Sequence, residues 1–153
     1  MTVLARAATE ADAGLLLDWR NDPRTRQASR STGVIALDEH SAWLRGVLAS
    51  TERALYVVEF DGVPVGTVRF DREEEEGVWE VSITLAPESR GRGLSGSVLA
   101  AGERAFTAGH RARVVVAAVH QDNAASAALF DRAGYTETAP AVDGFRKLRK
   151  TVA

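Results

Sequence analysis

The sequence predicts an α/β fold with helices on both faces of a mixed sheet, within one domain of 153 residues. Strand-like and helix-like segments alternate in the order β-α-α-β-β-β-α-β-α-β-β, as in α/β domains. Residues 113–119 (RVVVAAV) are continuously apolar after Arg113, which is typical of a central strand covered on both faces. No internal repeat and no long Pro-, Gly- or Ser-rich linker interrupts residues 1–153, so we expect a single domain.

The N-terminal third predicts one strand and two helices. Residues 2–7 form a short strand candidate, and Thr9 with Asp12 matches a capping box at the start of a helix that ends at Pro23. Residues 23–36 are polar and are predicted as a loop. Each predicted helix has apolar residues at helical spacing: Leu15, Leu16 and Trp19 in the first, and Trp43, Leu44, Val47 and Leu48 in the second, for which Asp38 can be the cap.

Three strands are expected next. Residues 54–60 and 63–70 flank Asp61-Gly62, a strong signal for a two-residue hairpin turn. An acidic run at 73–76 is best explained as a solvated turn before the strand at 78–85 (VWEVSITL).

The C-terminal half continues the alternation. We expect a helix over 93–108, the apolar strand 113–119, and a further helix capped by Asp122 or Asn123. Gly134 stands where the C-terminal cap of that helix belongs. The remainder predicts two short strands, YTETA and FRKLRK, and the charges of FRKLRK suit a strand at the edge of the sheet.

Composition excludes several classes of protein. The formal net charge is -2, whereas a nucleic-acid-binding surface would show a basic excess. With no cysteine, the chain has no disulfide, no thiolate metal site and no cysteine nucleophile. The histidines His40, His110 and His120 do not have the spacing of metal ligands, so no metal is expected. The sequence shows neither a signal peptide nor a membrane span, which favours the cytoplasm.

The strongest chemical signal is the glycine-rich turn ESRGRGLSGSVL, which follows the strand ending near Leu85. The first turn of the next helix leaves backbone N–H groups without partners at the positive end of the helix dipole. Glycines allow close approach of a phosphate oxygen, and arginines add charged donors. The predicted pyrophosphate cradle comprises Arg90, Gly91, Arg92, Gly93, Leu94, Ser95 and Gly96.

The turn also fits the dinucleotide-binding pattern G-x-G-x-x-G, through Gly91, Gly93 and Gly96. That interpretation is weak, because five residues separate the strand from the first glycine and about half of the chain precedes the motif.

A second family fits better. Arg90-x-x-Gly93, after a strand ending in Ala-Pro-Glu, resembles the acetyl-CoA pyrophosphate motif of the GCN5-related N-acetyltransferases (GNAT), with Ser95 in place of the usual glycine or alanine. A second block of the family, N-x-x-S-x-x-L-x-x-x-x-G-[FY], is matched by Asn123, Ser126, Leu129, Gly134 and Tyr135.

This resemblance implies a GNAT fold, with a mostly antiparallel sheet of six or seven strands and a V-shaped gap between strands 78–85 and 113–119. Acetyl-CoA would lie in the gap as co-substrate. Its pantetheine arm would pair with the backbone around Leu85, its pyrophosphate would bind the glycine-rich turn, and Asn123 and Ser126 would lie beside the arm.

Transfer to an amine requires a neutral nitrogen, so a base is useful. Alternation along 78–85 places Glu80 on a polar face with Ser82 and Thr84, and an interior strand has such a face when it lines a cleft. Glu80 is therefore the first candidate for the base and His120, after the apolar strand, the second. Many family members protonate the leaving thiolate with a tyrosine, and Phe130 occupies that position here.

The N-terminal segment resembles one GNAT branch, which contains ribosomal-protein N-acetyltransferase-like enzymes and N-acetyltransferases of amino-sugar nucleotides. The acceptor entrance is then predicted to involve Trp19, Arg20, Asn21 and His40, with Arg24 and Arg26 nearby. An amino-sugar nucleotide, a peptide N-terminus and a small amine all remain open as acceptors, as do a monomer and a homodimer. The alternatives to an amine acetyltransferase are a non-catalytic acyl-CoA-binding sensor on the same fold and a dinucleotide-binding protein.

Overall fold

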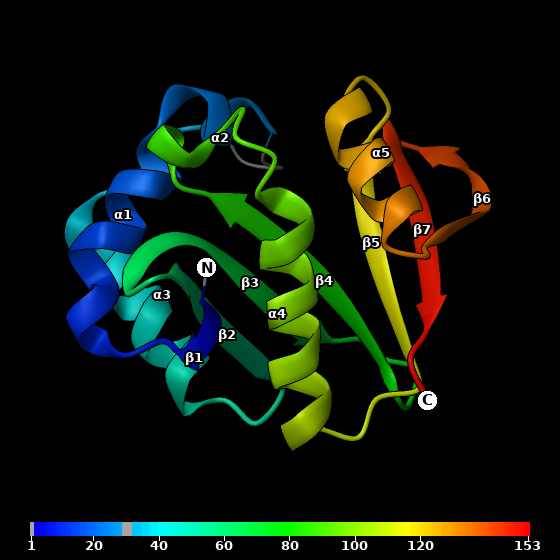
Figure 1. The fold of residues 1–153 in the computed structure, drawn as a ribbon, viewed down its shortest axis with the longest axis horizontal. Helices are drawn as coiled ribbons and strands as arrows, with labels where there is room; N and C mark the ends of the chain where they lie inside the picture. The colour runs from blue at the N-terminus through cyan, green and yellow to red at the C-terminus, as the bar shows by residue number, and fades with distance from the viewer. Residues whose placement is uncertain (1, 29–31) are drawn as a thin grey trace.

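The computed structural model describes residues 2–28 and 32–153 as a seven-stranded sheet with helices on both faces (Figure 1). The strand order is β1-β2-β3-β4-β5-β7-β6. The strands are β1 (Val3–Ala7), β2 (Arg53–Phe60), β3 (Val63–Arg72), β4 (Val78–Leu85), β5 (Val114–His120), β6 (Thr136–Val142) and β7 (Phe145–Thr151). The helices are η1 (Glu10–Asp12), α1 (Ala13–Asn21), α2 (Pro23–Ala28), α3 (Leu37–Ala49), η2 (Pro87–Ser89), α4 (Ser95–Gly109) and α5 (Ala124–Arg132).

The expected V-shaped gap is present between β4 and β5. All neighbouring strands pair antiparallel except these two, which run parallel. Their register covers only Val78–Glu80 of β4 against Val114–Val116 of β5. Beyond Glu80 the two strands diverge, as Figure 1 shows, so the β5-facing backbone edge of β4 makes no ladder there.

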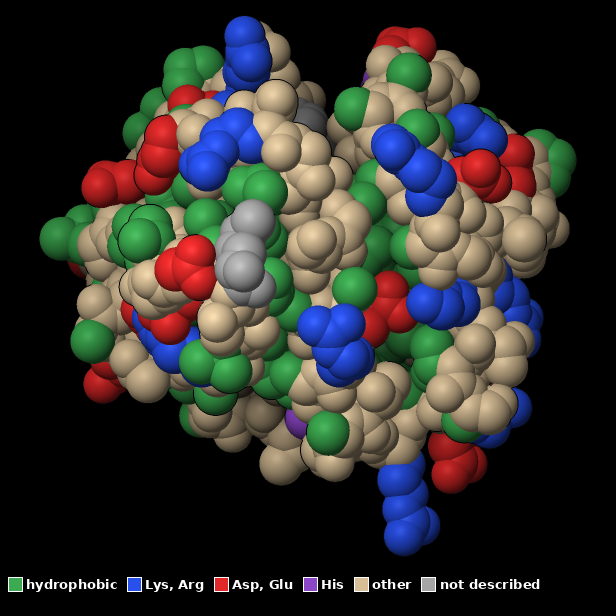
Figure 2. All heavy atoms as spheres, in the orientation of Figure 1, with side chains coloured by type: hydrophobic (Ala, Val, Ile, Leu, Met, Phe, Trp, Pro, Cys, Tyr) green, Lys and Arg blue, Asp and Glu red, His purple; other side chains and the backbone are tan. Residues whose placement is uncertain are grey.

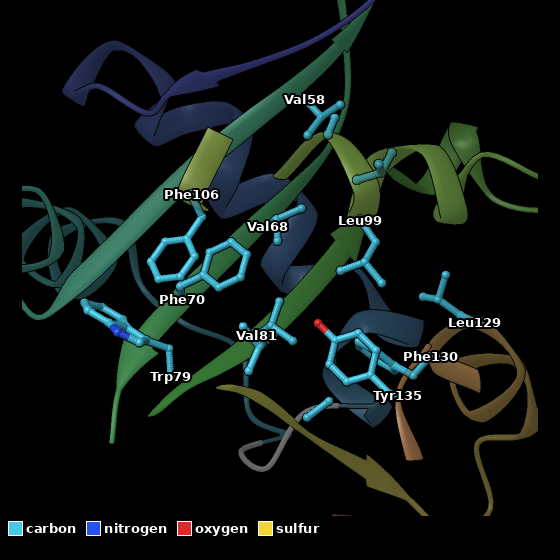
Figure 3. Close-up of a cluster of buried hydrophobic side chains, with 14 of the residues drawn as sticks. Val58, Val68, Phe70, Trp79, Val81, Leu99, Phe106, Leu129, Phe130 and Tyr135 are labelled. Carbon is cyan, nitrogen blue, oxygen red and sulfur yellow. The ribbon is translucent and has the colours of Figure 1, made fainter. Parts of the chain in front are cut away.

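The two faces of the sheet carry separate cores. Helix α4 packs on one face, where Phe106 stacks on Phe70 at 4.0 Å between ring centroids (Figure 3). It approaches closely because Gly102 has no side chain, and a Cβ there would stand 2.6 Å from Val68. Helices α1 and α3 cover the other face through a smaller cluster that includes Trp19 and Leu44. This arrangement confirms the predicted fold class.

Most element boundaries are confirmed within two residues. The Asp61-Gly62 turn has positive φ at both positions, as a two-residue hairpin requires. The Asn123 side chain caps α5 by accepting a hydrogen bond from the Ser126 N–H at 3.0 Å. Helix α4 begins at Ser95 rather than at 93, because Gly93 has a left-handed backbone with φ of 71°.

Three details of the prediction were wrong. Part of the predicted loop 23–36 is helix α2, which begins at Pro23, where α1 has already ended as predicted, while residues 29–31 lie outside the described part of the chain. The cause is Asp22, whose carboxylate accepts from the N–H groups of Arg24 and Thr25, so that Asp22-Pro23 forms an N-cap followed by proline at the first helical position. Asp38 lies in the first turn of α3, where Ala36 occupies the cap position. Leu48 is partly exposed and does not belong to the buried stripe of α3.

The C-terminal edge was also misassigned. Strand β7, with the charged sequence FRKLRK, pairs with both β5 and β6, and the edge strand is β6. Charges are tolerated on β7 because only Leu148 of that strand is buried. No helix in the described ranges has the length and apolar character needed to cross a membrane.

Candidate active site

A cavity of about 480 Å³ opens where β4 and β5 diverge. Its wall combines α1, α3, β3, β4 and β5 with the first turns of α5. In the space-filling view, a notch separates the α2 side of the molecule from the α5 side at this end (Figure 2). The cavity therefore joins the gap in the sheet to the face covered by α1 and α3.

The predicted polar face of β4 lines this cavity. Glu80, Ser82 and Thr84 all contribute to its wall. The antiparallel register sets Ser82 opposite Arg69 and Thr84 opposite Thr67, and both of these β3 residues line the cavity too. Side chains that are opposite one another in a ladder project to the same face, so β3 and β4 together present a polar floor.

Glu80 is half-buried in this floor, directly across the ladder from Asp71. Two carboxylates in such a pair repel each other unless a cation intervenes. Here the Asp71 carboxylate binds Nε of Arg69 at 2.9 Å and Nε of Arg53 at 3.3 Å. Asp71 is thus neutralised by arginines, and its repulsion of Glu80 is reduced.

His120 lies on the opposite wall of the same cavity. Its Nδ1 accepts a hydrogen bond from the Asp122 N–H at 3.1 Å, and its ring meets Phe145 edge-on with centroids 5.3 Å apart. A neutral imidazole that accepts at Nδ1 carries its proton on Nε2. In this arrangement Nε2 of His120 can donate a proton, and a role of His120 as the base stays a prediction. The described residues include no group of three or more His, Asp and Glu side chains that could hold a metal ion.

The glycine-rich turn lies at the end of β4 and forms no part of the cavity wall. Gly91 and Gly93 have φ of 73° and 71°, values that side chains rarely adopt. At Leu94, the N-cap position of α4, the side chain makes no cap hydrogen bond. Gly91, Arg92, Gly93 and Gly96 are all exposed. No side chain of a described residue caps the first N–H groups of α4, and their binding of pyrophosphate stays a prediction.

Arg90 differs from this expectation in the direction of its side chain. Its guanidinium binds the Asp22 carboxylate and the Thr25 hydroxyl, which belong to the start of α2. The same ion pair holds the pKa of Asp22 below its usual value, with the backbone N–H groups of Thr25 and Arg24 adding to the effect. Arg90 thus connects the glycine-rich turn to the N-terminal helices. A direct contact of Arg90 with phosphate stays a prediction.

The remaining predicted cofactor residues lie on β4 and at the start of α5, and their contacts with a cofactor stay a prediction. Asn123 and Ser126 line the cavity beside the gap. Leu85 ends the β3–β4 ladder opposite Gly66 and packs against the larger core.

Phe130 also lines the cavity, so no hydroxyl is supplied from that position. Its ring meets Tyr135 edge-on at 5.0 Å, and Tyr135 is almost fully buried in the core. Burial and the neighbouring Glu103 raise the pKa of Tyr135. The Tyr135 phenol is therefore neutral and is placed outside the cavity wall.

Three of the four predicted acceptor residues line the cavity: Trp19, Arg20 and His40. Asn21 does not, because its side-chain amide makes two 2.8 Å hydrogen bonds with the backbone of Ile35, which places Ile35 on the wall instead. His40 is only 4% exposed, and its Nδ1 makes no hydrogen bond with any described residue. Burial, together with the charge of Arg20, lowers the pKa of His40, so its ring is neutral at pH 7.

Two residues of this wall were missed by sequence reasoning. Arg69 lies with its guanidinium carbon 5.4 Å from the centroid of the Trp43 ring, and both line the cavity. The signal was present for Arg69, since alternation in VPVGTVRF places it on the same face as Thr67. Its closeness to Trp43 depends on how α3 packs on the sheet, which no local pattern states.

Comparison with known proteins gives one family and a consistent set of folds. The family model described as "Acetyltransferase (GNAT) domain" matches residues 2–136. A comparison with curated protein sequences gave no match.

Similar solved structures include three acetyltransferases. A ribosomal-protein-alanine N-acetyltransferase from Brucella melitensis is 25% identical, with a TM-score of 0.80 over 97% of this chain and 99% of the other. A spermidine N-acetyltransferase from Vibrio cholerae, in complex with CoA and spermine, is 17% identical, with a TM-score of 0.84 over 97% and 95%. An aminoglycoside acetyltransferase in complex with coenzyme A is 20% identical, with a TM-score of 0.82 over 98% and 95%.

Proposed function

Because the chain belongs to the GNAT family of acetyltransferases, we propose that it moves the acetyl group of acetyl-CoA directly to a primary amine while both substrates are bound. The observation that carries this proposal is the continuous cavity, which joins the β4–β5 gap to a polar wall built by α1, α3 and β3. Such a cavity allows a thioester and an amine to meet at Glu80. We expect this chemistry to take place in the cytoplasm.

Acetyl-CoA fits the first half of this arrangement. Solved structures of the same fold hold coenzyme A or acetyl-CoA. In this chain, the open N–H groups at the start of α4 and the exposed glycines before it suit a pyrophosphate. The β4 backbone beyond Glu80 makes no ladder with β5, so it offers hydrogen-bonding groups to the amide groups of a pantetheine arm. Asn123 and Ser126 would flank that arm.

The proposed reaction begins when the neutral amine attacks the thioester carbonyl carbon. A new C–N bond forms, the C–S bond breaks, and CoA leaves as a thiolate that must be protonated. The Glu80 carboxylate takes the proton from the amine, directly or through water, since an alkylamine with a pKa of about 10.4 is mostly protonated at pH 7. Because the chain has no cysteine, an S-acetyl enzyme cannot form.

The proton for the thiolate needs a source other than Phe130. We propose Nε2 of His120 or the hydroxyl of Ser82, because both residues line the cavity and both can donate. A thiol is a good leaving group, with a pKa near 8.5 for cysteine, so a weak donor or water is sufficient.

Three classes of acceptor fit the cavity, and the proposal does not choose between them. An amino-sugar nucleotide, a peptide N-terminus and a small amine are all compatible with an open cavity of about 480 Å³. The proteins with similar structures are named for different acceptors: a ribosomal-protein alanine, spermidine and aminoglycosides.

The proposal is tested by two measurements on the purified protein. Acetyl-CoA should raise the melting temperature and NAD should not, because a ligand that binds only the folded state stabilises it. Thiol release from acetyl-CoA should then occur with at least one member of an amine panel. If acetyl-CoA gives no stabilisation, the proposal is wrong. If acetyl-CoA stabilises the protein but no amine releases thiol, the non-catalytic sensor, which Phe130 favours, replaces it.

A further inference from the structure

We propose that the acceptor carries an anionic group, a carboxylate or a phosphate, a few bonds from its amine nitrogen, and that Arg69 and Arg20 bind this group. The inference deepens the proposed function and rests on it, because it assigns the substrate class of the same cavity. We call the part of the cavity lined by Trp19, Arg20, His40, Trp43 and Arg69 the acceptor wall. Three of its features support the proposal: the fixed position of Arg69, the positive charges of Arg20 and Arg69, and the distance from Arg69 to Glu80.

Arg69 is positioned as an anion-binding side chain. Its Nε is held by the Asp71 carboxylate at 2.9 Å, and its guanidinium carbon lies over the Trp43 ring, 5.4 Å from the ring centroid. Both Nη groups make no hydrogen bond with any residue in the described ranges, and the side chain is 30% exposed on the cavity wall. A guanidinium fixed through Nε presents two parallel N–H donors, which match two oxygens of a carboxylate or phosphate.

Positive charge is concentrated at the same end. Arg20 reaches the cavity from α1, and its pKa is lowered by burial and by the charges of Arg26 and Arg69. An anion bound between Arg20 and Arg69 would relieve this repulsion. A polycation such as spermine, which is present in the Vibrio cholerae structure, would increase it.

The register between β3 and β4 sets the distance between Arg69 and the carboxylate of Glu80. Among the described residues, the carboxylates on the wall are Glu39 and Glu80. Ser82 is directly across the ladder from Arg69, and Glu80 is two residues further along the same face of β4. Such diagonal neighbours have Cβ atoms roughly 7 Å apart. An acceptor whose anion binds Arg69 therefore places an amine near Glu80 when only a few bonds separate the two groups.

The test compares matched amines in the thiol-release assay with saturating acetyl-CoA. The pairs are a free α-amino acid and its amide, and O-phosphoethanolamine and ethanolamine, with spermidine as the polycation. At least one anionic member should exceed its uncharged partner at least tenfold in kcat/KM, and the pair in which this occurs tells carboxylate from phosphate. Spermidine should be poorer than either.

Variants of Arg69 test whether this residue causes the preference for an anionic acceptor. Arg69→Gln should lower kcat/KM about 10- to 100-fold for the anionic acceptor and change it little for the uncharged partner, the range expected when a charged hydrogen bond is lost. Arg72→Gln, at an exposed arginine on the same strand, is the matched control and should leave both values unchanged. Arg69→Lys keeps the positive charge beside Asp71 but lacks the two parallel N–H donors of the guanidinium. It should therefore raise KM for the anionic acceptor only.

The outcomes separate the two proposals. Equal rates for both members of each pair, or the best rate with spermidine, would overturn the anionic acceptor and leave acetyl transfer standing. An equal loss with every amine in Arg69→Gln and Arg69→Lys would assign Arg69 to the fold and overturn its role in binding. No thiol release with any amine would overturn acetyl transfer, and the acceptor class with it.

Discussion

The two ends of the proposed site are built from different parts of the chain. At the proposed cofactor end, which extends beyond the cavity to the glycine-rich turn, the elements expected to bind acetyl-CoA are backbone groups: the glycines with positive φ at 91 and 93, the first turn of α4, and the edge of β4 that makes no ladder with β5 beyond Glu80. At the acceptor end they are side chains, chiefly Arg20, His40 and Arg69. As proposed, the phosphates of acetyl-CoA are bound mainly by backbone groups of one turn, whereas the acceptor is selected by side chains gathered from several elements.

One interaction joins the two ends. The side chain of Arg90, in the glycine-rich turn, binds Asp22 and Thr25 at the start of α2. Helix α1, which ends one residue before Asp22, carries Trp19 and Arg20 on the acceptor wall. The position of the acceptor wall is thereby linked to the turn that would hold pyrophosphate.

The largest expected effect is at the point where the two ends meet. Glu80→Gln removes the proposed base, which should lower kcat about 10²- to 10⁴-fold, while the KM for acetyl-CoA and the stabilisation by acetyl-CoA are retained. Steady-state rates with the best amine measure this. Glu74→Gln, in the exposed turn before β4, is the control. A Glu80→Gln rate equal to that of the unaltered protein would exclude Glu80 as the base.

The next effect isolates the cofactor end. Gly93→Val forces a β-branched side chain into a backbone with φ of 71°, at a cost of about 1–3 kcal/mol if the conformation is kept. We expect the KM for acetyl-CoA to rise about 10- to 100-fold, equally for every amine, because the loss is on the shared substrate. Gly109→Ala, in open space at the far end of α4, is the control. A loss that depended on the amine used would contradict the division between the two ends.

A smaller effect tests the connection between the ends. Asp22→Asn weakens the ion pair with Arg90, so the KM values for acetyl-CoA and for the amine should both rise by about threefold to tenfold, within the range of one exposed or half-buried pair. Asp18→Asn, on the exposed side of α1, should change neither. If Asp22→Asn changes only one KM, the ends are independent.

The smallest effect concerns the start of α1, the helix that carries Trp19 and Arg20, where Asp12 accepts two 2.9 Å hydrogen bonds from the guanidinium of Arg6. This ion pair lowers the pKa of Asp12. The stability that it gives is therefore complete above the unfolded-state pKa near 3.8, and is lost as the pH falls through the lower folded-state value. Asp12→Asn should cost about 1 kcal/mol at neutral pH, or about 2–4 °C.

Melting temperatures measured between pH 7 and pH 2 provide the check. The gap between the unaltered protein and Asp12→Asn should be constant at neutral pH and narrow only in strong acid. A gap that narrowed between pH 7 and pH 5 would contradict the sign of the pKa shift.

The difference between local backbone patterns and side chains gathered by packing explains what the sequence could predict. The glycine-rich turn, the polar face around Glu80 and the Asn123 cap are local patterns, in which neighbouring residues determine the conformation. The partners of Arg69 and Arg90 are not local, because Trp43 and Asp22 approach them only through the packing of α3 and α2. The Asp22-Pro23 pair was a readable signal for α2, and it was outweighed by the polar composition of residues 23–36.

In the proposed reaction, acetyl-CoA and an amine occupy the two ends of the site at the same time. Initial rates of thiol release, measured while both concentrations are varied, show whether such a ternary complex forms. Direct transfer predicts double-reciprocal lines that intersect, since the amine must be bound before CoA leaves. Parallel lines would show that CoA departs before the amine binds, which requires an acetylated enzyme and would contradict the account.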